Sequence, residues 1–426
     1  MKLKMIKGLA LGLSCLAISA HGATQQNGAE AAADVEQAGH QAAPTCHYST
    51  WTEGVDYAVG SIVKYPANGS FYKETHAGSN GSDGSNPTSN SWYWAPVACS
   101  GSSTSTPKPP SKAPSNGFIF SPYFYSGDYN GTQLNTAVTG KSEPLLKAMP
   151  GKLSAVTWAF ATGSCGSENW NGVSAAAFAA ANVASFVSAG KKYIVSTGGG
   201  GANFSCTSDA NFAKFIKTYY SANLLGIDFD IENTQSQSDI NNLVARVAAA
   251  QATYPHLRFS FTLATDGGNE SQSLGKMGVR VMTAIQNYGL KDYTINLMTM
   301  DFADSGQANS SLCTLNSSRK CDMGKSAISA AQSLHNHWKV PYSQIELTPM
   351  IGGNDSIDET FTLADVVTVS NFASANKLAG IHFWSFERDR DCAPANKDNH
   401  SSNTCNNYGK AGTLGYTNKF ISALEL

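Results

Sequence analysis

Three carboxylates, Asp228, Asp230 and Glu232, occupy alternate positions in an otherwise apolar segment of the chain. Alternate side chains of a β-strand point to opposite faces, so the three acids share one face and the intervening apolar residues pack on the other. Acids crowded in this way repel one another, which raises the pKa of at least one of them. A carboxyl group that stays protonated near neutral pH can act as a general acid. The pattern therefore predicts a catalytic strand.

A solvated acidic edge strand and a calcium-binding ladder are the alternatives for this segment. Ile227, Phe229 and Ile231 lie on the face opposite the acids. Because three large apolar residues on that face call for burial, the pattern favours an interior strand over both alternatives.

Eight apolar runs rich in β-forming residues recur after residue 117, and the stretches between them carry helical periodicity. The runs lie near residues 118–123, 154–161, 192–197, 225–231, 258–264, 294–300, 344–350 and 379–385. The periodicity is clearest over residues 173–188, 211–220 and 239–252. Eight strand–helix units predict an α/β fold, a (β/α)8 TIM barrel over residues 117–426, rather than an open doubly wound sheet. A dinucleotide fold lacks its main support, since no GxGxxG motif opens a helix after the first strand.

Catalytic residues of such barrels lie at the carboxyl ends of the strands. Glu232 ends the fourth run, residues 298–301 end the sixth and Trp384 ends the eighth. The third run ends in four glycines, residues 198–201, which would let the backbone pass close to the fourth strand or to a ligand. A phosphate cradle is the alternative for the glycines, but no lysine follows them. A core aromatic is the alternative for Trp384.

Four of these segments together carry a family resemblance. Residues 226–232 resemble the catalytic signature of glycoside hydrolase family 18, the chitinase family. Residues 196–199 resemble its SxGG motif, residues 298–301 its strand-six motif and Trp384 its strand-eight tryptophan. The resemblance covers residues 117–426 and is closest to bacterial chitinases of the D type.

The resemblance implies a retaining, substrate-assisted hydrolysis without a cofactor or a metal ion. Glu232 would be the proton donor, Asp230 would hold the acetamido group of the substrate, and Asp228 would share a proton with Asp230. Trp384 would form the floor beneath the sugar at subsite −1. Further substrate-binding residues are expected at Tyr123, Gly198, Gly199, Met298, Met300 and Asp301.

The chain departs from the family pattern at two positions. Leu225 stands where the signature usually has aspartate; because it starts the strand, we expect an effect on stability rather than on activity. Met300 stands where most members have a tyrosine that donates to the acetamido oxygen, and methionine cannot donate. Either Asp301 or a tyrosine from another loop is expected to replace it, or the chain belongs to a subgroup built differently.

The first 22 residues fit a secretory signal peptide. Lys2, Lys4 and Lys7 precede an apolar run over residues 9–20, and small residues follow it. A lipoprotein anchored at Cys15 is the alternative, but residues 12–14 fit a lipid-attachment box poorly. Residues 23–45 are expected to form a disordered lead. A net charge of −2 with 14% charged residues argues against a nucleic-acid surface, and no other apolar run could span a bilayer.

Without Cys15 the chain has eight cysteines, an even number that suggests disulfides in an exported protein. Their grouping predicts four pairs of nearest neighbours: Cys46–Cys99, Cys165–Cys206, Cys313–Cys321 and Cys392–Cys405. Metal binding is the alternative, but there is no CxxC motif and no histidine at ligand spacing.

Residues 46–99 predict a small antiparallel all-β unit, separated from the barrel by a Ser-, Thr- and Pro-rich linker over residues 100–116. Eight of its nine aromatic residues lie between Trp51 and Trp94, more than so small a core needs, although a core of all eight is the alternative. The unit resembles the chitin-binding modules of carbohydrate-binding families 5 and 12. The candidate sugar-stacking rings are Tyr72, Trp92, Tyr93 and Trp94, of which Trp94, like Trp51, also fits the core.

The function expected is a secreted, monomeric chitinase whose partner is chitin or another glycan containing N-acetylglucosamine. An endo-β-N-acetylglucosaminidase acting on N-glycans is one alternative, and the predicted module, suited to insoluble chitin, argues against it. An inactive lectin of the same fold is another. Such lectins typically lose the acid, whereas Glu232 is present.

Overall fold

The computed structural model describes residues 45–46, 48–51, 57, 59–76, 86–88, 93–97, 99–101, 117–128, 131–232, 235–269, 272–303, 308–356, 359–393 and 401–426. The predicted signal peptide, almost all of the lead, residues 102–116 of the linker, and Trp92 lie outside the described residues. The chain divides into two compact units, Met1–Pro109 and Pro110–Leu426.

The larger unit is built on one parallel sheet with the strand order β7-β23-β20-β19-β18-β17-β15-β11-β8. Its strands are β7 (Ile119–Phe120), β8 (Tyr123–Tyr125), β11 (Ala155–Ala161), β15 (Lys192–Gly198), β17 (Leu224–Asp230), β18 (Arg258–Ala264), β19 (Thr294–Met298), β20 (Ile345–Thr348) and β23 (Gly380–Ile381). Every neighbouring pair is parallel. These strands match the eight predicted runs.

The first predicted strand is split into β7 and β8, and the split closes the barrel. Pro122 lies between the two parts and has no N–H for the ladder. β7 pairs with β23 and β8 pairs with β11, so the first run joins the last strand to the second. The predicted (β/α)8 barrel is confirmed.

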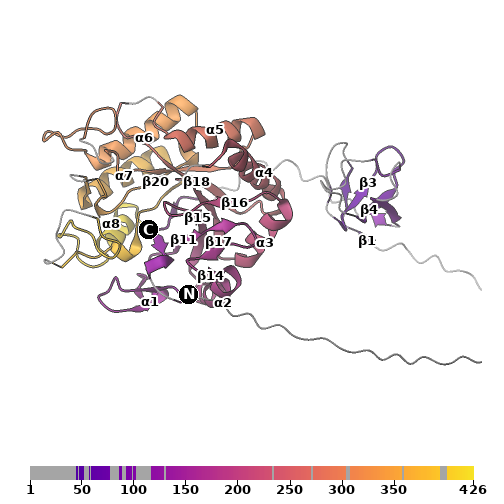
Figure 1. The fold of residues 1–426 in the computed structure, drawn as a ribbon, viewed down its shortest axis with the longest axis horizontal. Helices are drawn as coiled ribbons and strands as arrows, with labels where there is room; N and C mark the ends of the chain where they lie inside the picture. The colour runs from indigo at the N-terminus through magenta and orange to yellow at the C-terminus, as the bar shows by residue number, and fades with distance from the viewer. Residues whose placement is uncertain are drawn as a thin grey trace, which may run out of the picture. The chain divides into compact units, whose positions relative to one another are not determined.

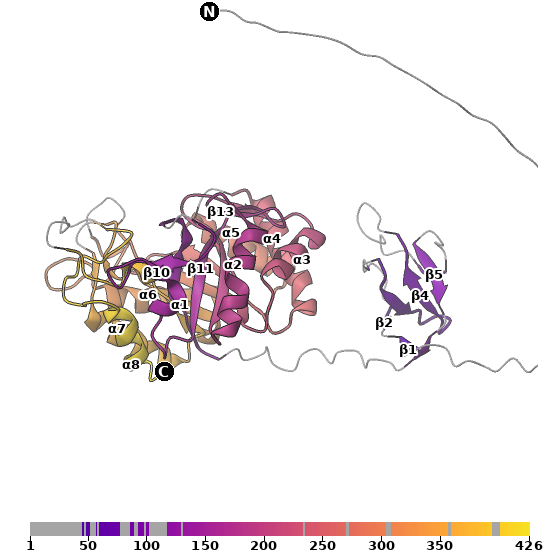
Figure 2. The same ribbon diagram turned by 90° about the horizontal axis from the view of Figure 1, so that it is seen from below.

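Helices alternate with the strands and lie on the outside of the sheet (Figures 1 and 2). They are α1 (Leu145–Ala148), α2 (Ala175–Ser188), α3 (Asp209–Tyr219), α4 (Gln237–Thr253), α5 (Lys276–Tyr288), α6 (Met323–Trp338), α7 (Leu363–Asn376) and α8 (Gly415–Ala423). Side-chain caps begin five of them, at Ser174, Ser208, Ser236, Asp322 and Thr362.

Short strands and 3-10 turns lie in the loops of the barrel. They are β9 (Asn135–Thr136), β10 (Glu143–Pro144), β12 (Gly163–Ser164), β13 (Asn169–Trp170), β14 (Val173–Ser174), β16 (Phe204–Ser205), β21 (Gly352–Gly353) and β22 (Thr360–Phe361), with the 3-10 turns η1 (Ser126–Asp128), η2 (Tyr342–Gln344) and η3 (Phe386–Arg388).

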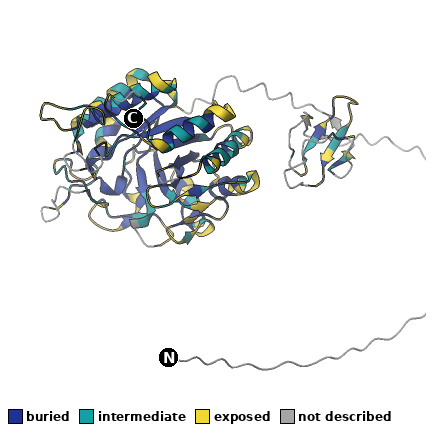
Figure 3. Ribbon diagram, turned by 45° about the horizontal axis from the view of Figure 1, so that its top comes forward, coloured by how far each residue is buried: buried dark blue, intermediate teal, exposed yellow. Residues whose placement is uncertain are grey.

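The two faces of β17 differ as predicted, one apolar and the other acidic. Phe229 is fully buried, and its ring lies 6.1 Å from that of Phe212 in α3 and 5.4 Å from that of Phe261 in β18. Its apolar face therefore packs against the helical layer, which leaves the acids to face the barrel interior. Figure 3 shows the result for the whole unit: the strands are buried, and the exposed surface lies mainly on the helices and loops.

The described strands of the smaller unit form two sheets. β2 (Ser49–Thr50), β3 (Ile62–Lys64), β4 (Phe71–Glu74) and β5 (Trp94–Val97) form one, and β1 (Thr45–Cys46) with β6 (Ser100–Gly101) forms the other. The pairs β3–β4 and β4–β5 are antiparallel. The predicted antiparallel sheet is therefore confirmed for β3, β4 and β5, whereas the pairs β2–β3 and β1–β6 are parallel.

Trp94 belongs to the core of the smaller unit. Its side chain is only 1% exposed, so it cannot stack on a sugar. The prediction that Trp94 is a stacking ring is wrong. Trp51 packs edge-on against Tyr65, with ring centroids 5.0 Å apart. Tyr72 and Tyr93 are partly exposed.

Three of the four predicted disulfides are confirmed: Cys165–Cys206, Cys313–Cys321 and Cys392–Cys405. Their Cα–Cα distances of 5.0 to 5.5 Å are ordinary for disulfides. The fourth prediction, Cys46–Cys99, involves the side chain of Cys46, which lies outside the described residues. Within the described part of the chain, no helix has the length and apolar character needed to cross a membrane.

Candidate active site

A cavity of about 510 Å³ opens at the carboxyl ends of the barrel strands. Most of the predicted site residues of the barrel line it: Tyr123, Gly198, Asp230, Glu232, Met298, Met300, Asp301 and Trp384. Asp228 lies beneath this surface and is 2% exposed. Residues that converge here come from strands far apart in the sequence, as expected for a barrel of parallel strands.

Four hydroxyl groups donate hydrogen bonds to the Asp228 carboxylate, two to each oxygen. Oδ2 accepts from Tyr123 (2.8 Å) and Ser196 (2.6 Å), and Oδ1 accepts from Ser260 (2.7 Å) and Thr262 (2.7 Å). Burial raises the pKa of Asp228, and all four hydrogen bonds lower it but offset the effect of burial only in part, so the net shift is upward. The four donors thus reduce the cost of a negative charge at the centre of the barrel.

A second layer of amide and hydroxyl groups orients these donors. The Asn296 side-chain amide donates to the hydroxyl oxygens of Tyr123 (3.0 Å) and Thr262 (2.9 Å), and its Oδ1 accepts from Thr348 (2.7 Å). Because the Tyr123 and Thr262 oxygens accept from Asn296, their hydrogens remain available for Asp228.

Asp230 differs from Asp228, because no described residue donates a hydrogen bond to its buried Oδ1. Burial raises the pKa of Asp230 well above its ordinary value, and the negative charges of Glu232 and Asp228 raise it further. Asp230 lines the cavity, so its carboxyl group is placed to accept a hydrogen bond from a ligand that carries an N–H group.

Glu232 stands at the end of β17, where its side chain is exposed to the cavity. Burial by the cavity walls raises its pKa, and the charges of Asp301 and Asp355 add to the effect. A carboxyl group that reaches solvent yet binds its proton more tightly than usual is suited to general acid catalysis. A Cβ atom at Gly200 would lie 3.5 Å from both Glu232 oxygens, so the glycine keeps this side of the carboxyl open.

The glycine run lets β15 approach β17, as predicted. Gly198 has a φ of +86°, and a Cβ atom there would lie 2.2 Å from the Asp230 carbonyl oxygen. The Gly199 N–H donates to the same oxygen at 3.1 Å, so a side chain at Gly198 would break this contact. Gly199 supports β17 from behind the residues that line the cavity.

Trp384 forms an aromatic wall rather than part of a closed core. It is partly exposed in the cavity and stacks on Phe160, with ring centroids 5.7 Å apart and planes at 13°. Tyr125 packs against the same indole at 5.9 Å. Sequence reasoning missed Phe160 and Tyr125, although Phe160 lies near the end of one predicted strand and Tyr125 follows another.

Met298 and Met300 line the cavity, so the structure places a thioether where the family pattern has a tyrosine. The Tyr123 hydroxyl already donates to Asp228 and accepts from Asn296. The other tyrosine of the lining is Tyr125. Asp301 also lines the cavity, so both predicted kinds of replacement for the missing hydroxyl are present.

Other polar residues of the site were missed as well. Asp355, which follows β20, lines the cavity. Ser260, Thr262 and Asn296 occupy inward positions of β18 and β19. Polar residues at every second position of an apolar run were the signal that could have identified the last three. Among the side chains that the structure describes, no group of His, Cys, Asp or Glu could hold a metal ion.

Comparisons with known proteins agree on one family. The family model described as "Glycosyl hydrolases family 18" matches residues 123–344, just over half of the chain. A probable bifunctional chitinase/lysozyme of Escherichia coli (strain K12) is 27% identical over 217 residues, which cover 47% of this chain and 24% of that protein. Endochitinase 11 of Metarhizium anisopliae is 26% identical over 227 residues, 48% of this chain and 41% of that protein. The chain thus spans less than half the length of these curated relatives.

One solved structure shows the same fold over almost its full length. The catalytic domain of a hyperthermophilic chitinase from Pyrococcus furiosus superposes with a TM-score of 0.56 at 22% identity. The superposition covers 72% of this chain and 95% of that domain.

Proposed function

Because the chain belongs to glycosyl hydrolase family 18, we propose that it is a chitinase, one that hydrolyses β-1,4 linkages of N-acetylglucosamine polymers with retention of configuration. One observation carries the proposal: Asp230, whose carboxyl group has no donor among the described residues at its buried Oδ1, lines the cavity together with the exposed acid Glu232. This pair matches a substrate that offers an amide N–H next to the bond that breaks.

The first step breaks the glycosidic bond. Glu232 gives its proton to the glycosidic oxygen while the carbonyl oxygen of the substrate acetamido group attacks the anomeric carbon. The bond from that carbon to the leaving oxygen breaks, and an oxazolinium ion forms within the sugar. The raised pKa of Glu232 keeps the proton available for this transfer.

Asp230 holds the acetamido group during this step. Its carboxylate accepts the amide N–H, which aligns the carbonyl oxygen with the anomeric carbon, and its negative charge stabilises the positive charge that develops. Asp228 acts from below. Both of its oxygens bind hydroxyl groups, so a proton shared with Asp230 requires one of these hydrogen bonds to rearrange.

The second step opens the oxazolinium ion. Glu232, now ionised, takes a proton from water as the water oxygen attacks the anomeric carbon on the face that the leaving group left. Two displacements at one carbon restore the original configuration. Asp301 or Tyr125 supplies the contact to the acetamido oxygen that Met300 cannot make. The stack of Trp384 on Phe160 forms the floor beneath the sugar.

The substrate proposed is insoluble chitin, and the enzyme a secreted monomer of the bacterial D type. Residues 46–99 would form a chitin-binding module, with Tyr72 and Tyr93 as stacking rings that are partly exposed in the structure. Trp92, which lies outside the described residues, is the third proposed stacking ring. Deletion of the residues before Gly117 should weaken binding to solid chitin and spare turnover of short soluble oligomers.

The decisive experiment replaces the proposed acid. We expect Glu232→Gln to fold as the wild type does and to lose about three orders of magnitude or more in turnover of a chitobiose-releasing chromogenic substrate. Turnover near the wild-type rate would refute the mechanism. Parallel assays on colloidal chitin and on a high-mannose glycoprotein separate the proposed activity from an endo-β-N-acetylglucosaminidase.

A further inference from the structure

Two loops at the rim of the cavity hold each other through Asp301. This residue has a φ of +50°, a left-handed conformation that is uncommon for residues with a side chain. Its N–H donates to Oδ1 of Asn354 at 3.2 Å, and its own Oδ1 accepts the N–H of Ser356 at 2.9 Å. Asp301 therefore joins the loop after β19 to the loop after β20 through both its backbone N–H and its side-chain carboxylate.

Glu359 joins the same two loops a second time. Its Oε2 accepts the N–H of Phe302 at 3.0 Å, and its Oε1 accepts the N–H of Ala303 at 2.8 Å. Its backbone binds its own loop, because its carbonyl accepts from Asn354 and its N–H donates to Ser356. One carboxylate thus holds the two residues that follow Asp301.

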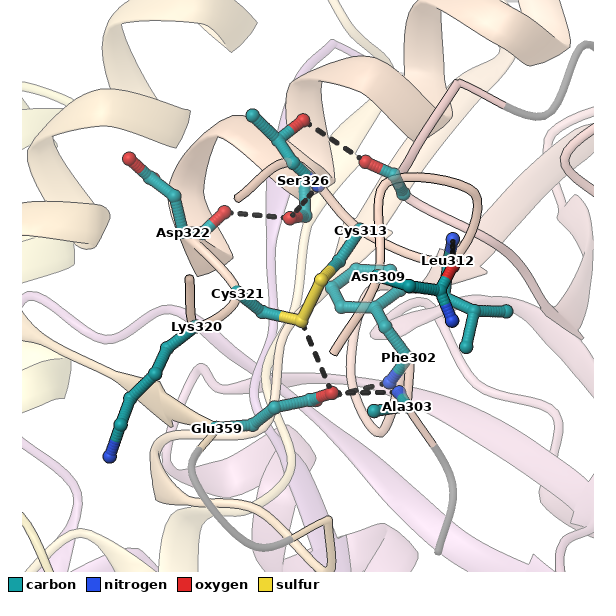
Figure 4. Close-up of a disulfide and its surroundings, with 12 residues drawn as sticks. Phe302, Ala303, Asn309, Leu312, Cys313, Lys320, Cys321, Asp322, Ser326 and Glu359 are labelled. Atoms are coloured by element: carbon teal, nitrogen blue, oxygen red, sulfur yellow. Dashed lines mark hydrogen bonds between the residues drawn. A yellow bond between two sulfur atoms is a disulfide. The ribbon is translucent and has the colours of Figure 1, made fainter. Parts of the chain in front are cut away.

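A disulfide encloses this carboxylate. Cys321 Sγ, bonded to Cys313, lies 3.5 Å from Oε1 of Glu359, and Glu359 is only 3% exposed. Figure 4 shows the carboxylate between the sulfur atoms and the backbone nitrogens of Phe302 and Ala303. Hydrogen bonds shielded from water in this way hold a backbone more firmly than exposed ones.

We propose that Glu359 is a positioning residue for the reaction: its carboxylate fixes the backbone after Asp301 and so holds the Asp301 side chain in the cavity that contains Glu232. The inference rests on the proposed function, in which Glu232 is the acid. Glu359 does not line the cavity, so it acts through Asp301 alone.

The charges that face Glu232 come from three elements. Asp230 lies on its own strand, Asp301 follows β19 and Asp355 follows β20. Besides burial, Asp301 and Asp355 raise the pKa of Glu232. The Arg388 guanidinium attracts both of these acids, but it donates its hydrogen bonds to backbone carbonyls of the β20 loop. The position of Asp301 therefore affects how tightly Glu232 holds its proton.

Glu359→Gln could change the pKa of Glu232 in two opposite ways, through the position of Asp301 or through the lost charge of Glu359. Glutamine has one acceptor oxygen, so one of the two N–H groups loses its partner and the backbone after Asp301 loosens. If Asp301 then moves away from Glu232, the pKa of Glu232 falls. If only the charge of Glu359 mattered, Asp301 would ionise more readily and the pKa of Glu232 would rise.

The experiment measures kcat/KM against pH on the chromogenic chitobioside. In Glu359→Gln we expect the basic limb, where Glu232 loses its proton, to move down by about half a pH unit. In an Asp301→Asn background the same substitution should cause no further shift. Hydrogen exchange of the peptide that contains Phe302 and Ala303 should become about tenfold faster.

Asp389→Asn is the matched control. The Asp389 carboxylate is also buried and also accepts two successive backbone N–H groups, those of Tyr416 and Thr417, but it holds α8. This variant should leave the basic limb in place. An unmoved or upward-moving limb in Glu359→Gln would overturn the proposal. A wild type without turnover refutes the proposed function instead, and the exchange rates then decide whether Glu359 holds the loop.

Discussion

Two groups of buried carboxylates share the interior of this barrel, and they are built in opposite ways. Glu346 of β20 is 1% exposed and pairs with the Arg258 guanidinium, while His382 Nε2 lies 3.4 Å from its second oxygen. Burial by itself would raise the pKa of Glu346, but Arg258 and His382 hold it at about 2. At the cavity, burial and neighbouring acids raise the pKa of both Asp230 and Glu232.

The difference separates a site that holds the fold together from one that performs chemistry. A buried acid with a cation beside it is ionised under all ordinary conditions and cannot give up a proton that it does not carry. A buried acid among other acids binds its proton more tightly than a solvated acid does, at a cost to stability that the rest of the barrel must offset.

Among the changes that test this contrast, Asp230→Asn should have the largest effect on turnover. Asparagine keeps the size of the side chain but removes the charge that stabilises the oxazolinium ion, so we expect kcat to fall by about two to three orders of magnitude. The free energy of unfolding should stay the same or rise, since the variant removes an unpaired acid. A fall of several degrees in Tm would show that Asp230 stabilises the fold and would remove the contrast.

Glu346→Gln should have the opposite effect: it should lower the stability of the fold and leave turnover unchanged. It leaves the Arg258 charge buried without its partner, and the loss of one partner of a buried pair costs about 3 kcal/mol of unfolding free energy. The kcat of the folded fraction should match that of the wild type. Chemical denaturation measures the first quantity and single-turnover kinetics at low temperature the second. A stable variant with low kcat would mean that Glu346 belongs to the catalytic group.

Stability should reach its maximum at mildly acidic pH. Burial raises the pKa of Glu359 to about 7 and that of Asp389 to about 6, both above the values in the unfolded chain. The stability linked to these protons is fully present below the unfolded pKa values, near pH 4, and is lost as the pH rises through 6 and 7. Glu346 acts in the opposite sense: its contribution is present above about pH 4 and is lost as the pH falls toward 2.

Calorimetry between pH 3 and pH 8 checks this dependence. We expect the free energy of unfolding to be about 4 kcal/mol lower at pH 8 than at pH 5, since Glu359 and Asp389 both lose their protons in this range. Glu359→Gln should flatten the decline on the neutral side, and Glu346→Gln the decline on the acidic side. A maximum at pH 8 in the wild type would contradict the raised pKa values of Glu359 and Asp389.

The contrast also explains which parts of the molecule the sequence could predict. The barrel and the acids of β17 follow from period-two patterns inside single runs, which need no knowledge of what lies opposite. Asp355 and Glu359 lie in a loop with no periodicity, and their importance comes from contacts with Asp301 more than fifty residues away. Glu346 was predicted only as part of a strand, because its partner Arg258 belongs to another one.

Trp94 shows the same limit in the smaller unit. An aromatic-rich segment indicates that some rings are exposed, but only the fold assigns them, and Trp94 is in the core.

Removal of single hydroxyl groups tests the contrast with the smallest expected effects. Ser260 donates to Asp228 at the catalytic group, and Ser121 lies 2.9 Å from His382 Nδ1 at the paired group. Each substitution by alanine removes one buried hydrogen-bonding group, so each should cost about 1 kcal/mol of unfolding free energy. Only Ser260→Ala should also slow turnover, by a few fold, since loss of one of four donors raises the pKa of Asp228 and weakens the charge beneath Asp230. Equal turnover in the two variants would mean that the hydroxyl groups around Asp228 serve packing alone, and that the catalytic group extends no deeper than Asp230.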